Sequence, residues 1–168
     1  MNLILCGMMG CGKTTIGRKI AEISGRTFCD TDEEIVAKYG RITDIFARFG
    51  EARFREMETE TVGELAQKDD LIIATGGGLT LKAENVTLLK ANGKIVYLRA
   101  KHETLFSRLQ KDSERPLLQS EKGLSERLTE LLQARAPVYG RVADYTVDVD
   151  GKTPENIAAE IIAWADGE

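Results

Sequence analysis

The feature that most constrains this chain is a glycine-rich segment close to its N-terminus. Residues 7–14 read G-M-M-G-C-G-K-T and match the pattern G-x4-G-K-[ST]. The segment follows an apolar run at 3–6, typical of a buried parallel strand, and precedes isoleucines at helical spacing. Glycines let successive backbone N–H groups face phosphate oxygens, and the helix presents its positive N-terminus to the same charge. The sequence therefore predicts a phosphate-binding loop, the P-loop, between a strand and a helix.

Each position of this loop has a predicted part in binding a nucleoside triphosphate. Lys13 would bridge the β- and γ-phosphates, and the Thr14 hydroxyl would bind Mg²⁺. The other predicted nucleotide-binding positions of the segment are Gly10, Cys11, Gly12 and Thr15. Cys11 is interpreted as a small residue that fits the turn, and a reactive thiol of low pKa is the alternative.

The loop indicates nucleotide binding without fixing the reaction, because small-molecule kinases, switches and motors all use it. A GTPase switch of this length would need a base-selective N-K-x-D motif, and the chain contains none. Motor proteins and related ATPases are usually longer. The loop therefore favours a small-molecule kinase.

Apolar runs recur along the chain and alternate with helical patterns. The predicted strands lie at residues 3–6, 27–29, 71–74, 95–98 and 145–149. Residues 32–68 are expected to be helical with breaks at Gly40 and Gly50, and a helix with a disturbance at Pro137 is expected over 124–142. This alternation predicts an α/β fold of three layers, a doubly wound parallel five-stranded sheet, in a single domain over 1–168. Ligands of such sheets bind at the carboxyl ends of the strands.

Composition excludes several other classes of protein. The chain has 168 residues, of which 42% are hydrophobic and 30% charged, as in ordinary globular domains. Its net charge is −4, whereas binding of nucleic acid needs a basic surface. An anionic ligand must therefore be held by a local cluster of positive side chains.

The sequence also bears on compartment and metal content. No apolar run reaches the roughly 18 residues of a membrane span, and the first residues lack the features of a signal peptide. The three cysteines, Cys6, Cys11 and Cys29, are odd in number and lack metal-type spacing, which indicates reduced thiols and a cytoplasmic protein. The lone His102 is expected at the surface, and zinc is not expected.

Further polar motifs follow the predicted strands. Asp30 and Asp32 come directly after the second strand, where a kinase needs carboxylates for Mg²⁺ and for the attacking hydroxyl; a helix cap is the alternative for one of them. Arg55 stands in the charged run 51–64, otherwise interpreted as a solvated face. The glycines at 76–78 suggest close approach of the backbone to a ligand, although a turn alone would also explain them.

Taken in order, these marks resemble the shikimate kinase family over essentially the whole chain. The matching segments are the P-loop, D-T-D at 30–32, F-R at 54–55, G-G-G at 76–78, R-P-L-L at 115–118, R-A-P-V-Y at 135–139 and Pro154. The resemblance implies a fold like that of nucleoside monophosphate kinases, with sheet order 2-3-1-4-5. It also implies a shikimate-binding helical region at about 31–60 and a lid over ATP at about 111–123.

The resemblance assigns roles to matching residues on the acceptor side. Asp32 would bind the ring hydroxyls, including the one phosphorylated, and Arg55 and Arg135 would bind the carboxylate of shikimate. Gly77 and Gly78 would offer backbone N–H groups to the same molecule.

On the nucleotide side the resemblance implies a metal site and an adenine site. Asp30 would support Mg²⁺ together with Thr14. Arg115 would reach the transferring phosphoryl group, and Arg108 and Pro154 would contact the two faces of adenine. Lys152 stands where some members have an arginine, so its nucleotide contact loses planar stacking.

The resulting expectation is a monomeric, cytoplasmic kinase that uses ATP and Mg²⁺ and binds neither nucleic acid nor membrane. It would transfer the γ-phosphate of ATP to the 3-hydroxyl of shikimate in aromatic amino-acid (chorismate) biosynthesis, with Lys13, Asp32 and Arg115 as catalytic residues. The alternatives are another small-molecule P-loop kinase, acting on gluconate or a nucleoside monophosphate, and a catalytically silent nucleotide-binding module.

Overall fold

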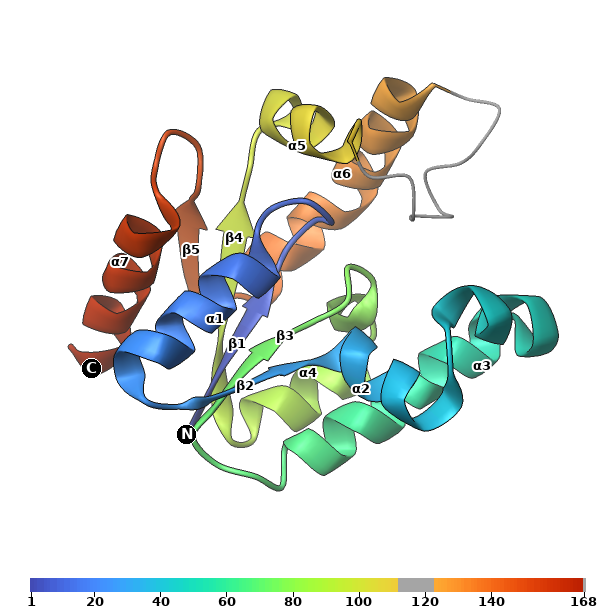
Figure 1. The fold of residues 1–168 in the computed structure, drawn as a ribbon, viewed down its shortest axis with the longest axis horizontal. Helices are drawn as coiled ribbons and strands as arrows, with labels where there is room; N and C mark the ends of the chain where they lie inside the picture. The colour runs from blue at the N-terminus through green and yellow to red at the C-terminus, as the bar shows by residue number, and fades with distance from the viewer. Residues whose placement is uncertain (112–122, 168) are drawn as a thin grey trace.

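A computed structural model describes residues 1–111 and 123–167 of the chain (Figure 1). The predicted lid at 111–123, with Arg115, therefore lies almost entirely outside the described residues. Within them, no helix is both long enough and apolar enough to cross a membrane.

The centre of the molecule is a five-stranded sheet. Its strands are β1 (Asn2–Cys6), β2 (Thr27–Asp30), β3 (Leu71–Ala74), β4 (Gly93–Arg99) and β5 (Tyr145–Asp148). All neighbouring pairs are parallel, in the order β2-β3-β1-β4-β5, so the predicted sheet order is confirmed. In the middle strand β1, Ile4 is paired with Ile73 on one side and Ile95 on the other. The central strands β1 and β3 are buried along their whole length, which explains why their apolar runs are continuous.

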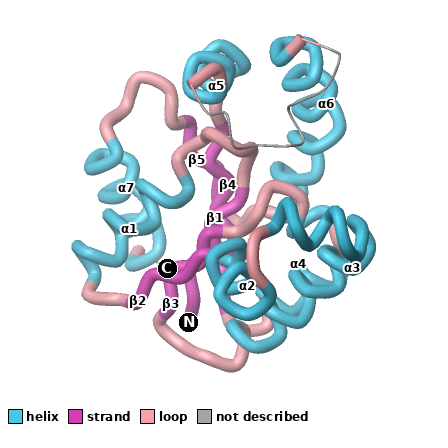
Figure 2. Tube along the Cα trace, turned by 45° about the vertical axis from the view of Figure 1, so that its right-hand side comes forward, coloured by secondary structure: helices cyan, strands magenta, loops and turns pink. Residues whose placement is uncertain are grey.

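Helices cover both faces of this sheet, as the three-layer prediction requires. They are α1 (Lys13–Ser24), α2 (Thr31–Tyr39), α3 (Ile42–Leu65), α4 (Ala83–Lys90), α5 (His102–Leu109), α6 (Leu124–Val142) and α7 (Pro154–Asp166), with a 3-10 turn η1 at Leu79–Leu81. Figure 2 shows the strands between α1 and α7 on one side and α3, α4 and α6 on the other.

Two glycines shape the region between β2 and β3, where the sequence predicted breaks. Gly40 ends α2 with φ 91°, and Gly50 interrupts α3 with φ 82° and ψ 171°. The bend lets α2 and the first part of α3 stand out from the sheet as a lobe (Figure 1). A small core of its own, made of Ile35, Ile45, Phe54 and Met57, packs the lobe against the second part of α3.

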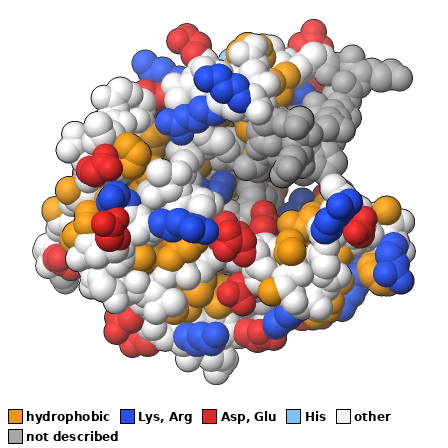
Figure 3. All heavy atoms as spheres, viewed as in Figure 1, with side chains coloured by type: hydrophobic (Ala, Val, Ile, Leu, Met, Phe, Trp, Pro, Cys, Tyr) orange, Lys and Arg blue, Asp and Glu red, His pale blue; other side chains and the backbone are white. Residues whose placement is uncertain are grey.

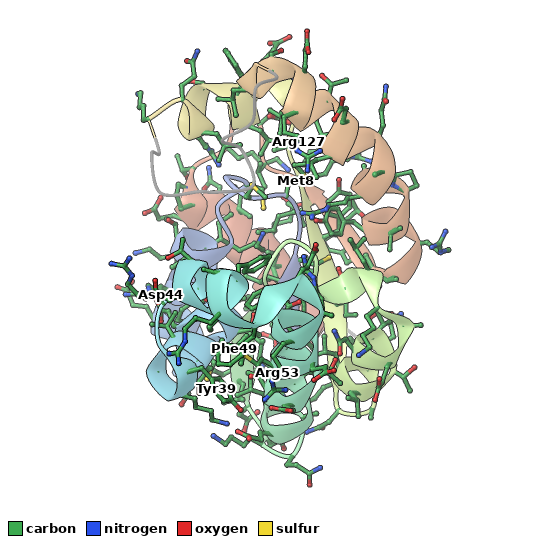
Figure 4. All side chains as sticks on the ribbon, turned by 90° about the vertical axis from the view of Figure 1, so that its right-hand side faces the viewer. Met8, Tyr39, Asp44, Phe49, Arg53 and Arg127 are labelled. Atoms are coloured by element: carbon green, nitrogen blue, oxygen red, sulfur yellow. The ribbon has the colours of Figure 1, made fainter. Side chains whose placement is uncertain are left out.

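The outer surface of this lobe carries aromatic and basic side chains. Tyr39, Phe49 and Arg53 are labelled there in Figure 4, and the Arg53 guanidinium lies 5.9 Å from the centre of the Tyr39 ring. The Tyr39 hydroxyl donates to Glu60 of α3 at 3.0 Å, which ties the end of α2 to the long helix. The lobe is therefore anchored to α3 by polar contacts outside and apolar contacts inside.

Candidate active site

The P-loop lies between β1 and α1, as predicted, and its glycines adopt backbone angles that side chains disfavour. The φ angles of Gly7, Gly10 and Gly12 are 147°, 84° and 103°. Gly12 caps α1 without any side-chain hydrogen bond, and the first turn of α1 contains no acidic residue. The positive end of the helix is therefore open to an anion from outside. Cys11 is buried against this loop at 1% exposure, which agrees with its interpretation as a small packing residue.

Lys13 is bound within its own loop. Its ammonium nitrogen donates to the carbonyl oxygens of Gly7 at 2.5 Å and Met8 at 3.2 Å. Met8, labelled in Figure 4, is itself buried at 2% exposure. The lysine thus lies inside the loop, next to the space that a bound phosphate chain would occupy.

Asp30 joins the P-loop helix to the first helix of the lobe. Its Oδ2 accepts from the Thr14 hydroxyl at 3.2 Å, and its Oδ1 accepts from the backbone N–H of Asp32 at 2.8 Å and of Glu33 at 3.2 Å. Asp30 is therefore the N-cap of α2, and Asp32 lies in the first helical turn. A hydroxyl and a carboxylate at this distance are oxygen donors of the kind Mg²⁺ prefers beside phosphates.

Among the residues predicted to contact adenine, Arg108 forms a hydrogen bond with the P-loop. Arg108 of α5 donates from Nη1 to the carbonyl of Gly10 at 2.9 Å, so this helix is attached to the loop. Pro154 occupies the first turn of α7. Lys152 forms an ion pair with Glu160 at 2.9 Å, which directs its charge along α7. The structure thus brings Arg108 to the P-loop and gives Lys152 a partner of its own.

After β3, each of the three glycines faces a charged side chain of the candidate site. A Cβ built on Gly76 would lie 2.9 Å from Asp32 Oδ1 and 3.0 Å from Glu58 Oε2. On Gly77 it would lie 3.0 Å from Arg135 Nη1, and on Gly78 it would lie 2.5 Å from Arg55 Nη1. The absence of Cβ atoms at these three positions thus lets the ends of charged side chains approach the backbone closely.

Glu58 is the functional residue that the sequence reasoning missed. The run 51–64 was interpreted as a solvated face apart from Arg55, but Glu58 is only 1% exposed and accepts from Arg55 Nη1 at 2.6 Å. Burial raises the pKa of Glu58, against the opposing effect of Arg55. The signal was helical spacing, since Phe54, Glu58 and Thr61 share the buried face of α3.

The two predicted carboxylate-binding arginines meet at one cavity. It has a volume of about 350 Å³ and is lined by Glu51, Arg55, Glu58, Gly78, Leu81, Lys82, Asn85 and Arg135. Arg135 is 8% exposed, and its Nη1 has no hydrogen-bond partner among the described residues; the same holds for Glu58 Oε2 and Asn85 Oδ1. Buried polar atoms of this kind indicate a site for a small polar molecule.

Positive side chains therefore gather locally on an acidic protein. Lys13, Arg55, Arg108 and Arg135 come from four different elements around the carboxyl ends of β1, β3 and β4. Figure 3 shows this face hollowed between the sheet and the lobe, with basic and acidic side chains around the hollow. The arrangement suits two anionic molecules bound side by side, one at the P-loop and one at the arginine pair.

Comparison with known proteins gives a consistent result. The family model of shikimate kinase matches residues 9–166. A shikimate kinase of Thermodesulfovibrio yellowstonii is 45% identical over 162 residues, covering 96% of this chain and 92% of the relative.

Solved structures give the same family. A shikimate kinase from Acinetobacter baumannii, in complex with shikimate, superposes with a TM-score of 0.93 at 41% identity over 99% of this chain and 93% of that one. A gluconokinase from Sinorhizobium meliloti superposes with a TM-score of 0.61 at 20% identity, covering 96% of this chain and 89% of that one, and so shares the fold alone.

Proposed function

The chain belongs to the shikimate kinase family, and from that premise we propose how its residues divide the reaction. It is an ATP-dependent kinase that phosphorylates a hydroxyl group of shikimate. We propose that the acceptor is the 3-hydroxyl, that the product is shikimate 3-phosphate and that the reaction belongs to chorismate biosynthesis. The observation that carries the assignment of residues is the trio of glycines, because it places Asp32, Arg135 and Arg55 around one short backbone segment.

On the acceptor side, Arg55 and Arg135 bind the carboxylate of shikimate. A planar guanidinium matches a carboxylate with two parallel hydrogen bonds, and Nη1 of Arg135 is buried without a partner in the described chain. Asp32 accepts hydrogen bonds from the ring hydroxyls, and Gly77 and Gly78 contribute backbone N–H groups. Asp32 then orients the attacking hydroxyl toward the P-loop and accepts its proton.

On the nucleotide side, the P-loop binds the phosphates of ATP. The loop residues involved are Gly10, Cys11, Gly12, Lys13, Thr14 and Thr15. Thr14 and Asp30 hold Mg²⁺, whose chemistry when bound is to neutralise charge on the phosphate oxygens. Phosphoryl transfer passes through a loose transition state, so Lys13 and Arg115 act by charge neutralisation and positioning.

Adenine binds between Arg108 and Pro154. Two observations support this proposal. Arg108 donates to the carbonyl of Gly10 in the P-loop, and Pro154 is the first residue of helix α7. Lys152 adds positive charge at the edge of this site while paired with Glu160. The proposal also includes a single domain over 1–168, with a shikimate-binding region at 31–60, a lid at 111–123, a monomeric state and a cytoplasmic location.

The carboxylate-binding role of Arg135 is tested by measuring KM for shikimate and KM for ATP on the variant Arg135→Ala. Arg135→Ala should raise KM for shikimate by about 10- to 100-fold, because a charge-assisted pair is lost, and leave KM for ATP within twofold. Arg141→Ala on the exposed end of the same helix is the matched control and should change neither constant. Equal rises in both constants would contradict the carboxylate role, and absence of phosphorylated shikimate by ³¹P NMR would contradict the reaction.

A further inference from the structure

Tyr139 is a fully buried polar residue that the proposed mechanism does not use. It lies on α6 one helical turn after Arg135, and its side chain is 0% exposed. Its ring contacts that of Tyr97 on β4, with centroids 5.3 Å apart. Packing alone would be served by phenylalanine, so the buried hydroxyl needs a separate explanation.

The Tyr139 hydroxyl connects the glycine segment to Arg135. It donates a hydrogen bond to the carbonyl oxygen of Gly77, and Arg135 lies at the same glycine: a Cβ built on Gly77 would be 3.0 Å from Arg135 Nη1 and 3.8 Å from the Tyr139 hydroxyl oxygen. Burial raises the pKa of Tyr139, so the hydroxyl keeps its proton and remains a donor at neutral pH. The same hydroxyl therefore fixes two groups that line the acceptor site.

The hydrogen bond to Gly77 also fixes the direction of the next N–H group. The Gly77 carbonyl and the Gly78 N–H belong to one peptide unit, which is planar and, as throughout the described chain, trans. In a trans peptide these two groups point in opposite directions. Holding the carbonyl toward Tyr139 therefore aims the Gly78 N–H the other way.

The carbonyls on either side of Gly77 have backbone partners, so Tyr139 acts on the Gly77 carbonyl alone. The carbonyl of Gly76 accepts from Leu79 N–H at 3.1 Å, and that of Gly78 accepts from Leu81 N–H at 3.2 Å, as parts of the η1 turn. The carbonyl of Gly77 between them is held by the tyrosine. Local backbone bonds thus set the turn, whereas a side chain from α6 sets the tilt of its central peptide.

We propose that Tyr139 is a positioning residue for the acceptor. Its hydroxyl sets the direction of the Gly78 N–H and the position of the Arg135 guanidinium, so that both groups are correctly oriented before shikimate binds. The inference rests on the proposed function, because it takes Gly78 and Arg135 as shikimate contacts. It adds a residue that touches neither substrate.

The test is Tyr139→Phe, which keeps the ring and removes only the hydroxyl. The variant should raise KM for shikimate about 5- to 30-fold, which is the effect of losing one hydrogen bond to a charged or buried group. KM for ATP should stay within twofold. Tyr97→Phe is the matched control, since it removes the hydroxyl from the other member of the same ring pair, and it should leave both constants unchanged.

A purely structural role would give a different pattern. Loss of folded protein lowers the apparent kcat in proportion to the active fraction but does not alter KM for shikimate. A rise in KM therefore separates a positioning role from loss of folded protein, even for a destabilised variant assayed at reduced temperature. A double variant with Arg135→Ala supplies a second measurement. If Tyr139 acts through Arg135, the effect of Tyr139→Phe on KM should be at most half as large, in logarithmic terms, in that background.

The outcomes separate this inference from the proposed function. An unchanged KM for shikimate in Tyr139→Phe, or an equal rise with Tyr97→Phe, overturns the positioning role while leaving the function intact if Arg135→Ala still raises that constant. A full, additive effect in the Arg135→Ala background overturns the link through Arg135. If the wild-type chain does not phosphorylate shikimate, the function itself fails.

Discussion

Adding one methyl group at Gly78 should disable acceptor binding without straining the backbone. Gly78 has φ −95° and ψ −6°, a conformation with negative φ that alanine also adopts in turns, so Gly78→Ala mainly tests space. The new Cβ would lie 2.5 Å from Arg55 Nη1 and 2.8 Å from Cζ and Nη2. The guanidinium must then retreat by about 0.9 Å to reach ordinary contact at 3.4 Å.

The size of the effect follows from what that guanidinium holds. Arg55 donates to Glu58 at 2.6 Å and to Glu51 at 3.2 Å, and it is proposed to bind the acceptor carboxylate. A displacement near 1 Å at a positioning group costs up to about 10²-fold. We therefore expect kcat/KM for shikimate to fall by about 10- to 100-fold, with KM for ATP within twofold. Overpacking should lower stability by about 1–3 kcal/mol, which for a chain of this size is a decrease in Tm of a few degrees.

The assay is coupled ADP release with each substrate varied in turn, together with thermal unfolding. Gly63→Ala is the control, because it lies in α3 with nothing within 4 Å of its Cβ. That variant should keep both Michaelis constants and gain up to about 1 kcal/mol from better helix propensity. A Gly78→Ala enzyme with a normal KM for shikimate would refute the reasoning that glycine is required at this position to leave space for the Arg55 guanidinium.

Two further substitutions address the remaining parts of the site, and a third addresses the stability of the fold. Asp32→Asn should lower kcat by about 10²-fold or more, since the amide accepts the hydroxyl proton poorly, while nucleotide affinity measured by calorimetry stays unchanged; retention of more than a tenth of kcat would count against it. Arg108→Ala should raise KM for ATP by about 10-fold through loss of stacking and of the Gly10 contact, and an equal rise for shikimate would contradict a role confined to the nucleotide. Asp150→Asn should lower Tm at pH 7. Burial raises the pKa of Asp150, but hydrogen bonds from Thr104 and the Lys101 N–H outweigh it and lower that pKa, so the stabilisation is present above pH 4 and is lost as pH falls through the folded value. A Tm difference that persists undiminished at pH 2 would refute this last expectation.

Much of the fold was predictable because its central strands, β1, β3 and β4, are short, apolar and mostly buried. The run at 71–74 coincides with β3, and the predicted helix over 124–142 coincides with α6. Gly50 was predicted as a break and is the bend of α3. The helix α4 was not anticipated, since it is short and buries only Asn85 and Leu89. Periodicity is weak when so few positions face the core.

The residues of the candidate site were predictable where a sequence motif indicates their chemistry. They were less predictable where their position depends on a tertiary contact. The P-loop and the pair Asp30 and Asp32 follow from pattern and strand ends. That Asp30, and not Asp32, caps the helix depends on where α2 begins, which sequence fixes only within a few residues. The burial of Glu58 depends on how α3 lies against the glycine segment at 76–78, which is distant in sequence. Local composition carries no information about such contacts.

The hydrogen bonds of Lys13 have a consequence for how nucleotides are told apart. Because its ammonium already donates to the carbonyls of Gly7 and Met8, only its third N–H is left for a phosphate while both bonds stay in place. Under the proposed function, a phosphate chain gains this contact only if it is long enough to reach the lysine while its other phosphates stay on the loop N–H groups. The contact with the lysine would therefore depend on the length of the phosphate chain more than on its charge. The loop would in this way prefer a triphosphate over a shorter anion.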